Sequence, residues 1–467
     1  MKKVIRLFTL LAGLCIVPFA SAQGVLGTWN GSLVLPVDTM PLVFHISQDA
    51  LGTYATTMDI PYQQAKDIPT QSTSFSDFIL VIQIPAIGSV YKGTLHDDGT
   101  IRGTFTQKGV ARALNLERGA WTEKKTGRPQ EPVPPFPYKS EEVVVRNESA
   151  GINLAGTLTL PEKGKKFPAV VLVTGSGAQN RDEELLGHKP FLVLSDYLTR
   201  NGIAVLRCDD RGTAASEGNY ATATDVDFAT DAAAAIRYLQ GRKEIDKRKI
   251  GILGHSSGGS VSFMTAAKDP SIAFVVSLAG PGVRGDSVLL KQVETLYKLQ
   301  GMTADEWTWV EKFMWNNYAI LQQTDKAPEV LEKELYGAIM GTMSAEQQQD
   351  ANIIRKMAVE ARQMTSPWYL HMLRYEPSVD LQHVKCPVLA LNGERDIQVN
   401  AAMNLEGIRR HLAGNGNKRV TVKAYPHLNH LFQTCQTGAP AEYAELEETM
   451  SPAMLKDITA WILQQTR

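Results

Sequence analysis

One serine of the chain lies between glycines at the spacing that a reactive nucleophile needs. Gly254-His255-Ser256-Ser257-Gly258 follows the run Lys249–Leu253, which is typical of a strand, and precedes small residues that can begin a helix. A nucleophile on a sharp turn between strand and helix needs glycine two positions before it and two after it, because side chains there would collide with the neighbouring strand and helix. Ser256 has this spacing, whereas Ser257 has His255 two positions before it. The pattern predicts nucleophilic attack by the Ser256 hydroxyl.

A candidate acid lies later in the chain. A serine hydroxyl is a weak nucleophile, so a histidine must accept its proton and a carboxylate must orient that histidine. With the nucleophile on such a turn, the acid and then the histidine follow in chain order. Val388–Leu391 is typical of a strand running into the turn Asn392-Gly393, and Asp396 follows as the candidate acid. Glu394, earlier in the same turn, is the alternative.

The candidate base follows one further strand-like segment. Arg419–Ala424 alternates in hydropathy as a half-buried strand does, and the loop after it contains His427 and His430. We favour His430, with His427 as the alternative. The order Ser256, Asp396, His430 is the one that a nucleophile on a strand-to-helix turn requires.

Two backbone N–H groups are candidates for an oxyanion hole, which would stabilise the negative oxygen of a tetrahedral intermediate. One belongs to Ser257, the residue after the nucleophile. The other belongs to Ser176, in the loop Thr174–Gly177 that follows the apolar run Ala169–Val173. This loop does not predict a phosphate site, because no Gly-Lys-Ser/Thr follows it and the dinucleotide-binding spacing is absent.

The segment that carries these residues alternates apolar strands with amphipathic helices. The strand-like runs are Ala169–Val173, Ile203–Leu206, Ile250–Leu253, Phe274–Leu278 and Val388–Leu391, and the helix-like stretches include Phe191–Arg200 and Asp225–Leu239. Runs that are apolar on both faces predict a mostly parallel sheet with helices on both sides. Such sheets place their sites at the carboxyl ends of the strands. We therefore predict an α/β domain over residues 141–467.

One long insertion interrupts this alternation. Strand patterns stop between Gly280 and Val384, and this stretch is typical of helices. Within it, Trp307, Val310, Met314 and Tyr318 recur at helical spacing. The insertion stands before the strand that carries the candidate acid. We expect a helical lid over the site at about residues 283–383. The alternative is a helical subdomain that only packs on itself.

Residues 23–125 have a different pattern, with short strands and turns. Strand-like runs include Gly27–Trp29, Leu42–Ile46, Tyr54–Met58, Phe78–Ile82 and Ile101–Phe105, and Asp97–Thr100 is typical of a hairpin turn. We predict a small antiparallel barrel or sandwich with an accessory or stabilising role. A proline-rich linker at residues 126–140 follows, because prolines at this density prevent a helix or a central strand.

The first 22 residues have the features of a cleavable signal peptide. Cations at positions 2, 3 and 6 precede the apolar run Leu7–Phe19, and Ala20-Ser21-Ala22 supplies a small-residue cleavage site before Gln23. The run is shorter than the roughly 20 residues that a membrane-spanning helix needs. We expect export to the periplasm or the medium.

Composition excludes several classes of partner. The chain has 48 Lys and Arg against 49 Asp and Glu, with no basic stripe, so no nucleic-acid partner is expected. Beyond the signal peptide, Cys208, Cys386 and Cys435 are an odd number without zinc-type spacing, which favours free thiols over a disulfide framework. We expect no metal, no cofactor and no stable membrane insertion.

Several motifs together resemble one family. From about Glu141 onward the sequence is similar to exported bacterial α/β-hydrolase esterases of the serine-aminopeptidase-like group. The shared motifs are Gly175-Ser176-Gly177 with Arg181-Asp182-Glu183, then Gly187–Phe191, Asp209–Gly212, the Ser256 turn, Asn392–Asp396 and Asn429–Phe432. The resemblance implies a triad of Ser256, Asp396 and His430 and hydrolysis of short acyl esters. Thr213–Ser216 departs from the family pattern, in which a second glycine usually stands after Arg-Gly.

We therefore expect a serine carboxylesterase that cleaves a small-molecule acyl ester through an acyl-enzyme intermediate. A peptidase or amidase would use the same three residues, and so would an acyltransferase in which an alcohol replaces water. From a different class, the chain could be a binding protein whose β domain holds a glycan or a lipid. The sequence leaves the natural ester and the oligomeric state open.

Overall fold

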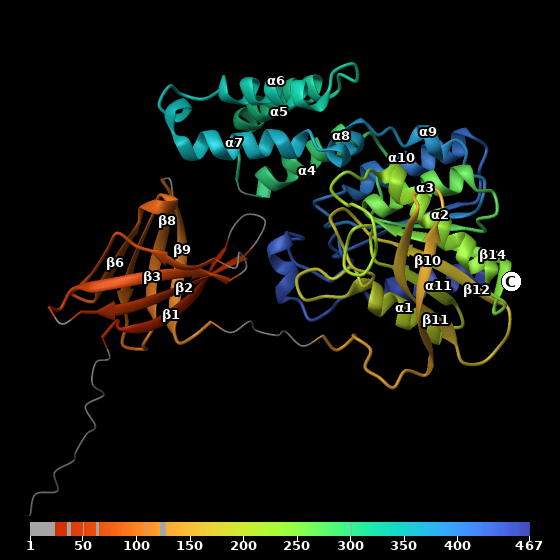
Figure 1. Ribbon diagram of the computed structural model, residues 1–467, viewed down its shortest axis with the longest axis horizontal. Helices are drawn as coiled ribbons and strands as arrows, with labels where there is room; N and C mark the ends of the chain where they lie inside the picture. Colours follow the sequence, from red (N-terminus) through yellow and green to blue (C-terminus); the bar gives the residue numbers. More distant parts are fainter. Residues whose placement is uncertain are drawn as a thin grey trace, which may run out of the picture. The chain divides into compact units, whose positions relative to one another are not determined.

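The protein consists of two compact units. A computed structural model describes residues 24–34, 39–49, 51–61, 65–107, 109–121, 128–299 and 301–467 (Figure 1). One unit lies within residues 1–124 and the other within residues 125–467. The predicted signal peptide, residues 1–22, lies outside the described residues. No helix in the described part of the chain is long and apolar enough to cross a membrane.

The N-terminal unit is a small antiparallel β domain, as predicted. Its nine strands form one sheet in the order β4-β3-β2-β1-β9-β8-β7-β6-β5. The strands are β1 (Gly27–Val34), β2 (Thr39–Gln48), β3 (Tyr54–Ile60), β4 (Ala65–Pro69), β5 (Ser72–Ser76), β6 (Ile79–Ile84), β7 (Ser89–Leu95), β8 (Ile101–Gln107) and β9 (Val110–Arg118). Trp29, Phe44 and Tyr91 are fully buried in its core. The strand predicted from Phe78 begins one residue later, because Asp77 and Phe78 form a turn with φ of 50° and 63°.

The C-terminal unit contains an eight-stranded mixed sheet in the order β10-β11-β13-β12-β14-β15-β16-β17. The strands are β10 (Tyr138–Asn147), β11 (Ile152–Pro161), β12 (Phe167–Val173), β13 (Ala204–Cys208), β14 (Ile245–His255), β15 (Val275–Leu278), β16 (Val388–Gly393) and β17 (Val420–Tyr425). β10, β11 and β13 pair antiparallel, whereas all pairs from β13 to β17 are parallel. This is the mostly parallel sheet that the apolar runs predict.

Helices cover both faces of this sheet. The flanking helices are α1 (Pro190–Arg200), α2 (Asp225–Gly241), α3 (Ser257–Lys268), α10 (Ala401–Gly414) and α11 (Pro452–Gln465). Residues of α2, α3 and α10 share one buried cluster with Val171, and residues of α1 and α11 share another with Val170 and Leu172. Alternate residues of β12 therefore enter opposite cores, which explains why its sequence is apolar at successive positions.

The main elements of the insertion between β15 and β16 are helices. It contains α4 (Gly285–Leu299), α5 (Ala304–Leu321), α6 (Pro328–Met340), α7 (Ala351–Met364), α8 (Pro367–Arg374) and α9 (Ser378–Leu381) (Figure 1). These helices have a core of their own that includes Tyr318, Leu331 and Leu335. Of the four residues predicted to share a helical face, Tyr318 is buried, whereas Trp307, Val310 and Met314 are only partly buried.

The proline-rich segment is attached to the C-terminal unit from Arg128 onward. The Arg128 guanidinium donates hydrogen bonds to the carbonyl oxygens of Gly187 (3.1 Å), Ala444 (2.8 Å) and Leu446 (2.5 Å). The first strand of the unit begins at Tyr138, three residues before the expected domain start at 141. The segment 128–137 is therefore part of the folded unit, where the sequence predicted a linker.

Candidate active site

Ser256 lies on a strained turn between β14 and α3. Its φ of 53° is rare for a residue with a side chain, and such strain persists only where the surrounding structure enforces it. The Ser256 N–H donates to the Leu278 carbonyl of the neighbouring strand at 2.8 Å. A Cβ on Gly254 would come within 1.9 Å of the Gly258 oxygen, and one on Gly258 within 2.3 Å of the Val173 oxygen. The close approach required at both glycines is the one that the sequence pattern predicts.

Asp396 and His430 form a buried pair. The Nδ1 atom of His430 lies 2.7 Å from Oδ2 of Asp396, and both side chains are nearly inaccessible. The second carboxylate oxygen, Oδ1, accepts the N–H groups of Gln398 (2.8 Å) and Val399 (2.9 Å). Because the turn after β16 fixes Asp396 through these bonds, the carboxylate can hold one orientation of the His430 ring.

The two alternative residues lie outside this pair. Glu394 and His427 are both exposed, whereas Asp396 and His430 are buried. His427 has a φ of 64° at the start of the loop, and its carbonyl accepts the N–H of Cys435 at 2.9 Å. The structure therefore brings Asp396 together with His430, and neither Glu394 nor His427 joins them.

His430 lies beside the end of β14, directly before Ser256. The ring of His255, which directly precedes Ser256, has its centroid 4.8 Å from that of His430. The Nε2 atom of His255 also lies 3.0 Å from the main-chain oxygen of His430. Ser256, Asp396 and His430 thus come from the ends of β14, β16 and β17, which are the carboxyl ends of parallel strands.

The predicted oxyanion loop passes directly against the nucleophile turn. A Cβ placed on Gly175 would lie 3.2 Å from Cβ of Ser256 and 3.4 Å from the His255 oxygen. Ser176, the residue after Gly175, is exposed at the end of β12. Ser257 is the first residue of α3, where a backbone N–H has no partner within the helix. Both predicted donors therefore belong to segments that adjoin Ser256.

The sequence did not reveal the role of Glu183. Arg181 pairs with Asp209 and Asp182 pairs with Arg207, so these two brace the sheet. Glu183 instead is buried with a φ of 53°, and its Oε1 lies 2.8 Å from the Gly175 nitrogen and 3.0 Å from Nδ1 of His255. No spacing rule signals this contact, because it depends on a loop conformation rare for glutamate.

The Asp209–Gly212 turn is a structural brace. Arg211 binds Asp231 through Nε (2.7 Å) and Nη2 (2.9 Å). Asp210 accepts the Thr174 hydroxyl at 2.6 Å and the Gln179 N–H at 2.9 Å. Burial raises the pKa of Asp210 to about 7, against these two hydrogen bonds, which lower it. Because both donors flank Ser176, this turn holds the loop that carries the predicted donor Ser176.

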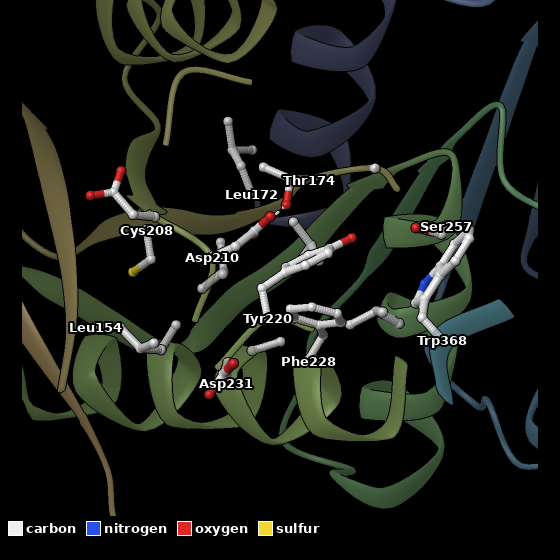
Figure 2. A pocket seen from close by; sticks show the side chains of 17 residues that line it. Leu154, Leu172, Thr174, Cys208, Asp210, Tyr220, Phe228, Asp231, Ser257 and Trp368 are labelled. Carbon is white, nitrogen blue, oxygen red and sulfur yellow. Dashed lines mark hydrogen bonds between the residues drawn. The ribbon is translucent and has the colours of Figure 1, made fainter. Parts of the chain in front are cut away.

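A cavity opens next to this loop. Its wall includes Gly175, Ser257, Tyr220, Phe228 and Trp368. Figure 2 shows Trp368 beside Ser257 on one side of the cavity and Leu154 and Cys208 on the opposite side. Trp368 belongs to α8 of the helical insertion, and its Nε1 donates to Asp225 of α2 at 2.9 Å. The insertion thus contributes one aromatic wall.

Comparisons with known proteins show the family of this chain. Residues 150–428 match the X-Pro dipeptidyl-peptidase (S15) family. The chain belongs to this family. It is also 23% identical to esterase EstD of Thermotoga maritima over 385 residues, which are 82% of this chain and 81% of EstD. The family match and the similarity to esterase EstD together show that the protein is a serine hydrolase.

Two solved structures are among those that resemble this chain. A hypothetical protein of Pseudomonas aeruginosa, PA2218, has a TM-score of 0.45 and 16% identity over 74% of this chain and 98% of its own. The Pyrococcus furiosus esterase Pf2001 has a TM-score of 0.42 and 16% identity over 75% of this chain and 96% of its own. Within the described ranges, no group of three or more His, Cys, Asp or Glu side chains is placed to hold a metal ion.

Proposed function

We propose that the protein is a serine carboxylesterase that hydrolyses short-chain acyl esters with Ser256, His430 and Asp396. The observation that carries this proposal is the buried Asp396–His430 pair beside the strained Ser256 turn. A carboxylate on Nδ1 leaves Nε2 of the same ring as the base, which is the arrangement that activates a serine hydroxyl.

The reaction proceeds in two acyl transfers. His430 takes the proton from the Ser256 hydroxyl, and the oxygen attacks the ester carbonyl carbon. The N–H groups of Ser176 and Ser257 stabilise the resulting oxyanion, and each such donor is typically worth about 3–4 kcal/mol. The intermediate collapses when His430 protonates the leaving alcohol. Water, deprotonated by His430, then attacks the acyl-enzyme and releases the carboxylic acid.

The helical insertion is proposed to act as a lid. Trp368 of α8 lines the cavity beside Ser257, so the insertion shares a wall with the space next to the nucleophile. We expect the aromatic side chains of this wall to limit the length of the acyl group. Trp368→Ala would remove this part of the wall and enlarge the cavity. We expect the variant to prefer longer acyl chains than the native enzyme in a series of p-nitrophenyl esters.

A peptidase is the second candidate, because the family match is to dipeptidyl-peptidases. Kinetics on p-nitrophenyl acetate to octanoate and on X-Pro p-nitroanilides separate the two activities. We expect ester turnover to exceed anilide turnover by a wide margin, and to disappear in Ser256→Ala while surface Ser271→Ala retains it. Anilide turnover at a comparable kcat/KM would assign the peptidase activity instead.

Export is proposed on the sequence alone. The charged, apolar and small-residue segments of residues 1–22 support cleavage before Gln23. N-terminal sequencing of the protein recovered from the periplasm of an expressing cell tests this directly. A first residue of Gln23 supports export, whereas an intact Met1 in the cytosol contradicts it.

A further inference from the structure

A second carboxylate–histidine pair lies beneath the nucleophile turn. Glu183 and His255 have side chains only 4% and 8% exposed, and Oε1 of Glu183 lies 3.0 Å from Nδ1 of His255. The same Oε1 accepts the N–H of Gly175 at 2.8 Å. On the other side of the ring, Nε2 lies 3.0 Å from the carbonyl oxygen of His430.

These contacts run continuously from one catalytic loop to another. Gly175 belongs to the loop that carries the proposed oxyanion donor Ser176. His430 is the proposed base, and the contact reaches its main chain rather than its ring. His255 occupies the position directly before Ser256. Two buried side chains therefore connect all three parts of the proposed machinery.

The hydrogen bonds fix the number of protons that the pair must hold. A carbonyl oxygen only accepts, so Nε2 of His255 carries a proton toward His430. The contact between Nδ1 and Oε1 needs a second proton, held by one of the two atoms. Burial is the largest single effect on the pKa of His255 and lowers it. The charge of Glu183 and its hydrogen bond act in the opposite direction, and the pKa of His255 is raised overall. Because Oε1 of Glu183 already accepts the N–H of Gly175, we assign the second proton to Nδ1 of His255.

We propose that Glu183 and His255 form a positioning dyad that, while it holds both ring protons, ties the oxyanion loop to the loop of the catalytic histidine across the Ser256 turn. The dyad rests on the proposed esterase function and adds to it two positioning residues that touch no substrate. The protonated ring cannot act as a base, because both its nitrogens donate.

The dyad makes the alkaline side of the pH profile diagnostic. The groups that face His255 are Glu183 at Nδ1, the His430 main chain and ring, and Asp396 through its charge. Since the pKa of His255 is raised, its proton is present at low pH and is lost as pH rises through the folded-state value. The tie between the loops is then lost, and activity falls on the alkaline limb.

Glu183→Gln tests the dyad without changing the shape of the side chain. A neutral imidazole has only one N–H, so it can donate to residue 183 or to the His430 carbonyl but not to both. Turning the amide so that its NH₂ faces the ring would remove the oxygen that accepts the Gly175 N–H. We expect kcat on p-nitrophenyl acetate to fall about 10- to 100-fold with KM within about twofold, as for small misplacements of reacting groups. The alkaline limb of kcat should move to lower pH. Glu184→Gln, the exposed neighbour, is the matched control and should keep both values.

Two outcomes would overturn the dyad. One is a folded Glu183→Gln variant with the kcat and alkaline limb of Glu184→Gln. The other needs no variant: nitrogen-15 NMR of the native enzyme at neutral pH showing a single protonated ring nitrogen on His255. We expect both ring nitrogens to be protonated. If Glu183→Gln fails to fold, this NMR measurement decides alone.

A failure of the dyad is distinguishable from a failure of the esterase function. Fluorophosphonate labelling reports the nucleophile itself. Rapid labelling at Ser256 in the native enzyme and in Glu183→Gln, at equal rates, rejects the dyad and leaves the esterase function intact. No labelling at Ser256 in any form rejects the esterase function, on which the dyad depends. Slower labelling in Glu183→Gln alone supports both.

Discussion

Two buried carboxylate–histidine pairs flank Ser256, and they are built alike but connected differently. Asp396 holds His430 at 2.7 Å, and Glu183 holds His255 at 3.0 Å, each through Nδ1. The Nε2 atom of His255 contacts a main-chain carbonyl, so that ring is fixed at both ends. In the proposed mechanism Nε2 of His430 exchanges a proton with Ser256 instead. A carboxylate–histidine pair can thus supply a base in one place and a brace in another.

The largest expected effect separates the two histidines of one loop. His430→Ala should lower kcat on p-nitrophenyl acetate by on the order of 10⁵- to 10⁶-fold, because a serine without its base loses nearly all nucleophilic catalysis. His427→Ala, at the exposed position, should keep the native kcat. Steady-state kinetics on both purified variants checks this. Equal losses in the two would remove His430 from its proposed role.

Asp396→Asn should have the next largest effect. The amide can no longer fix the ring with a proton on Nδ1, and such a change costs about 10⁴-fold in kcat with little change in geometry. Glu394→Gln is the control from the same turn. A kcat for Asp396→Asn within tenfold of the native value would mean that the carboxylate does not orient the base.

A double-mutant cycle sharpens the contrast between the two pairs. If Glu183 and His255 act as one unit, Glu183→Gln and His255→Gln should each lower kcat about 10- to 100-fold, and the double variant should be no worse than the poorer single. Kinetics of the four proteins gives the interaction directly. Additive losses would show that the residues act separately, and the dyad would be abandoned.

The smallest effect concerns a buried carboxyl whose hydrogen bond comes from a neutral group. Burial raises the pKa of Asp225 to about 7, with the Trp368 hydrogen bond acting in the opposite direction. Its folded-state pKa lies above its unfolded value, so the native state loses stability as pH rises from about 4 to 7. Asp225→Asn should therefore stabilise the protein by an amount that grows over this range and stays constant above it, on the order of 1–3 kcal/mol. Urea unfolding across pH, with exposed Asp305→Asn as the control, tests the direction.

Much of the fold could be predicted from local patterns. Strands such as β12 and β16 enter cores on both faces, so their apolar runs are visible in the sequence. The β domain was predicted from turns and alternation, although its single nine-stranded sheet could not be, because strand order depends on long-range pairing. The attachment of Arg128 to residues 444–446 was missed for the same reason.

The candidate site divides in a similar way. Glycine spacing and chain order predicted Ser256, Asp396 and His430, because a close backbone approach requires glycine at fixed positions around the nucleophile. No sequence pattern predicted the role of Glu183, since its approach to His255 depends on a positive φ within a polar loop. The helical insertion was predicted as helices, but the position of Trp368 against the cavity follows from tertiary packing alone.

The most direct test of the account is fluorophosphonate labelling of the purified protein, followed by mass mapping of the modified peptide. The account predicts one label, on Ser256, with parallel loss of label and of p-nitrophenyl acetate turnover in Ser256→Ala. A label on another residue, or ester turnover retained by Ser256→Ala, would contradict it.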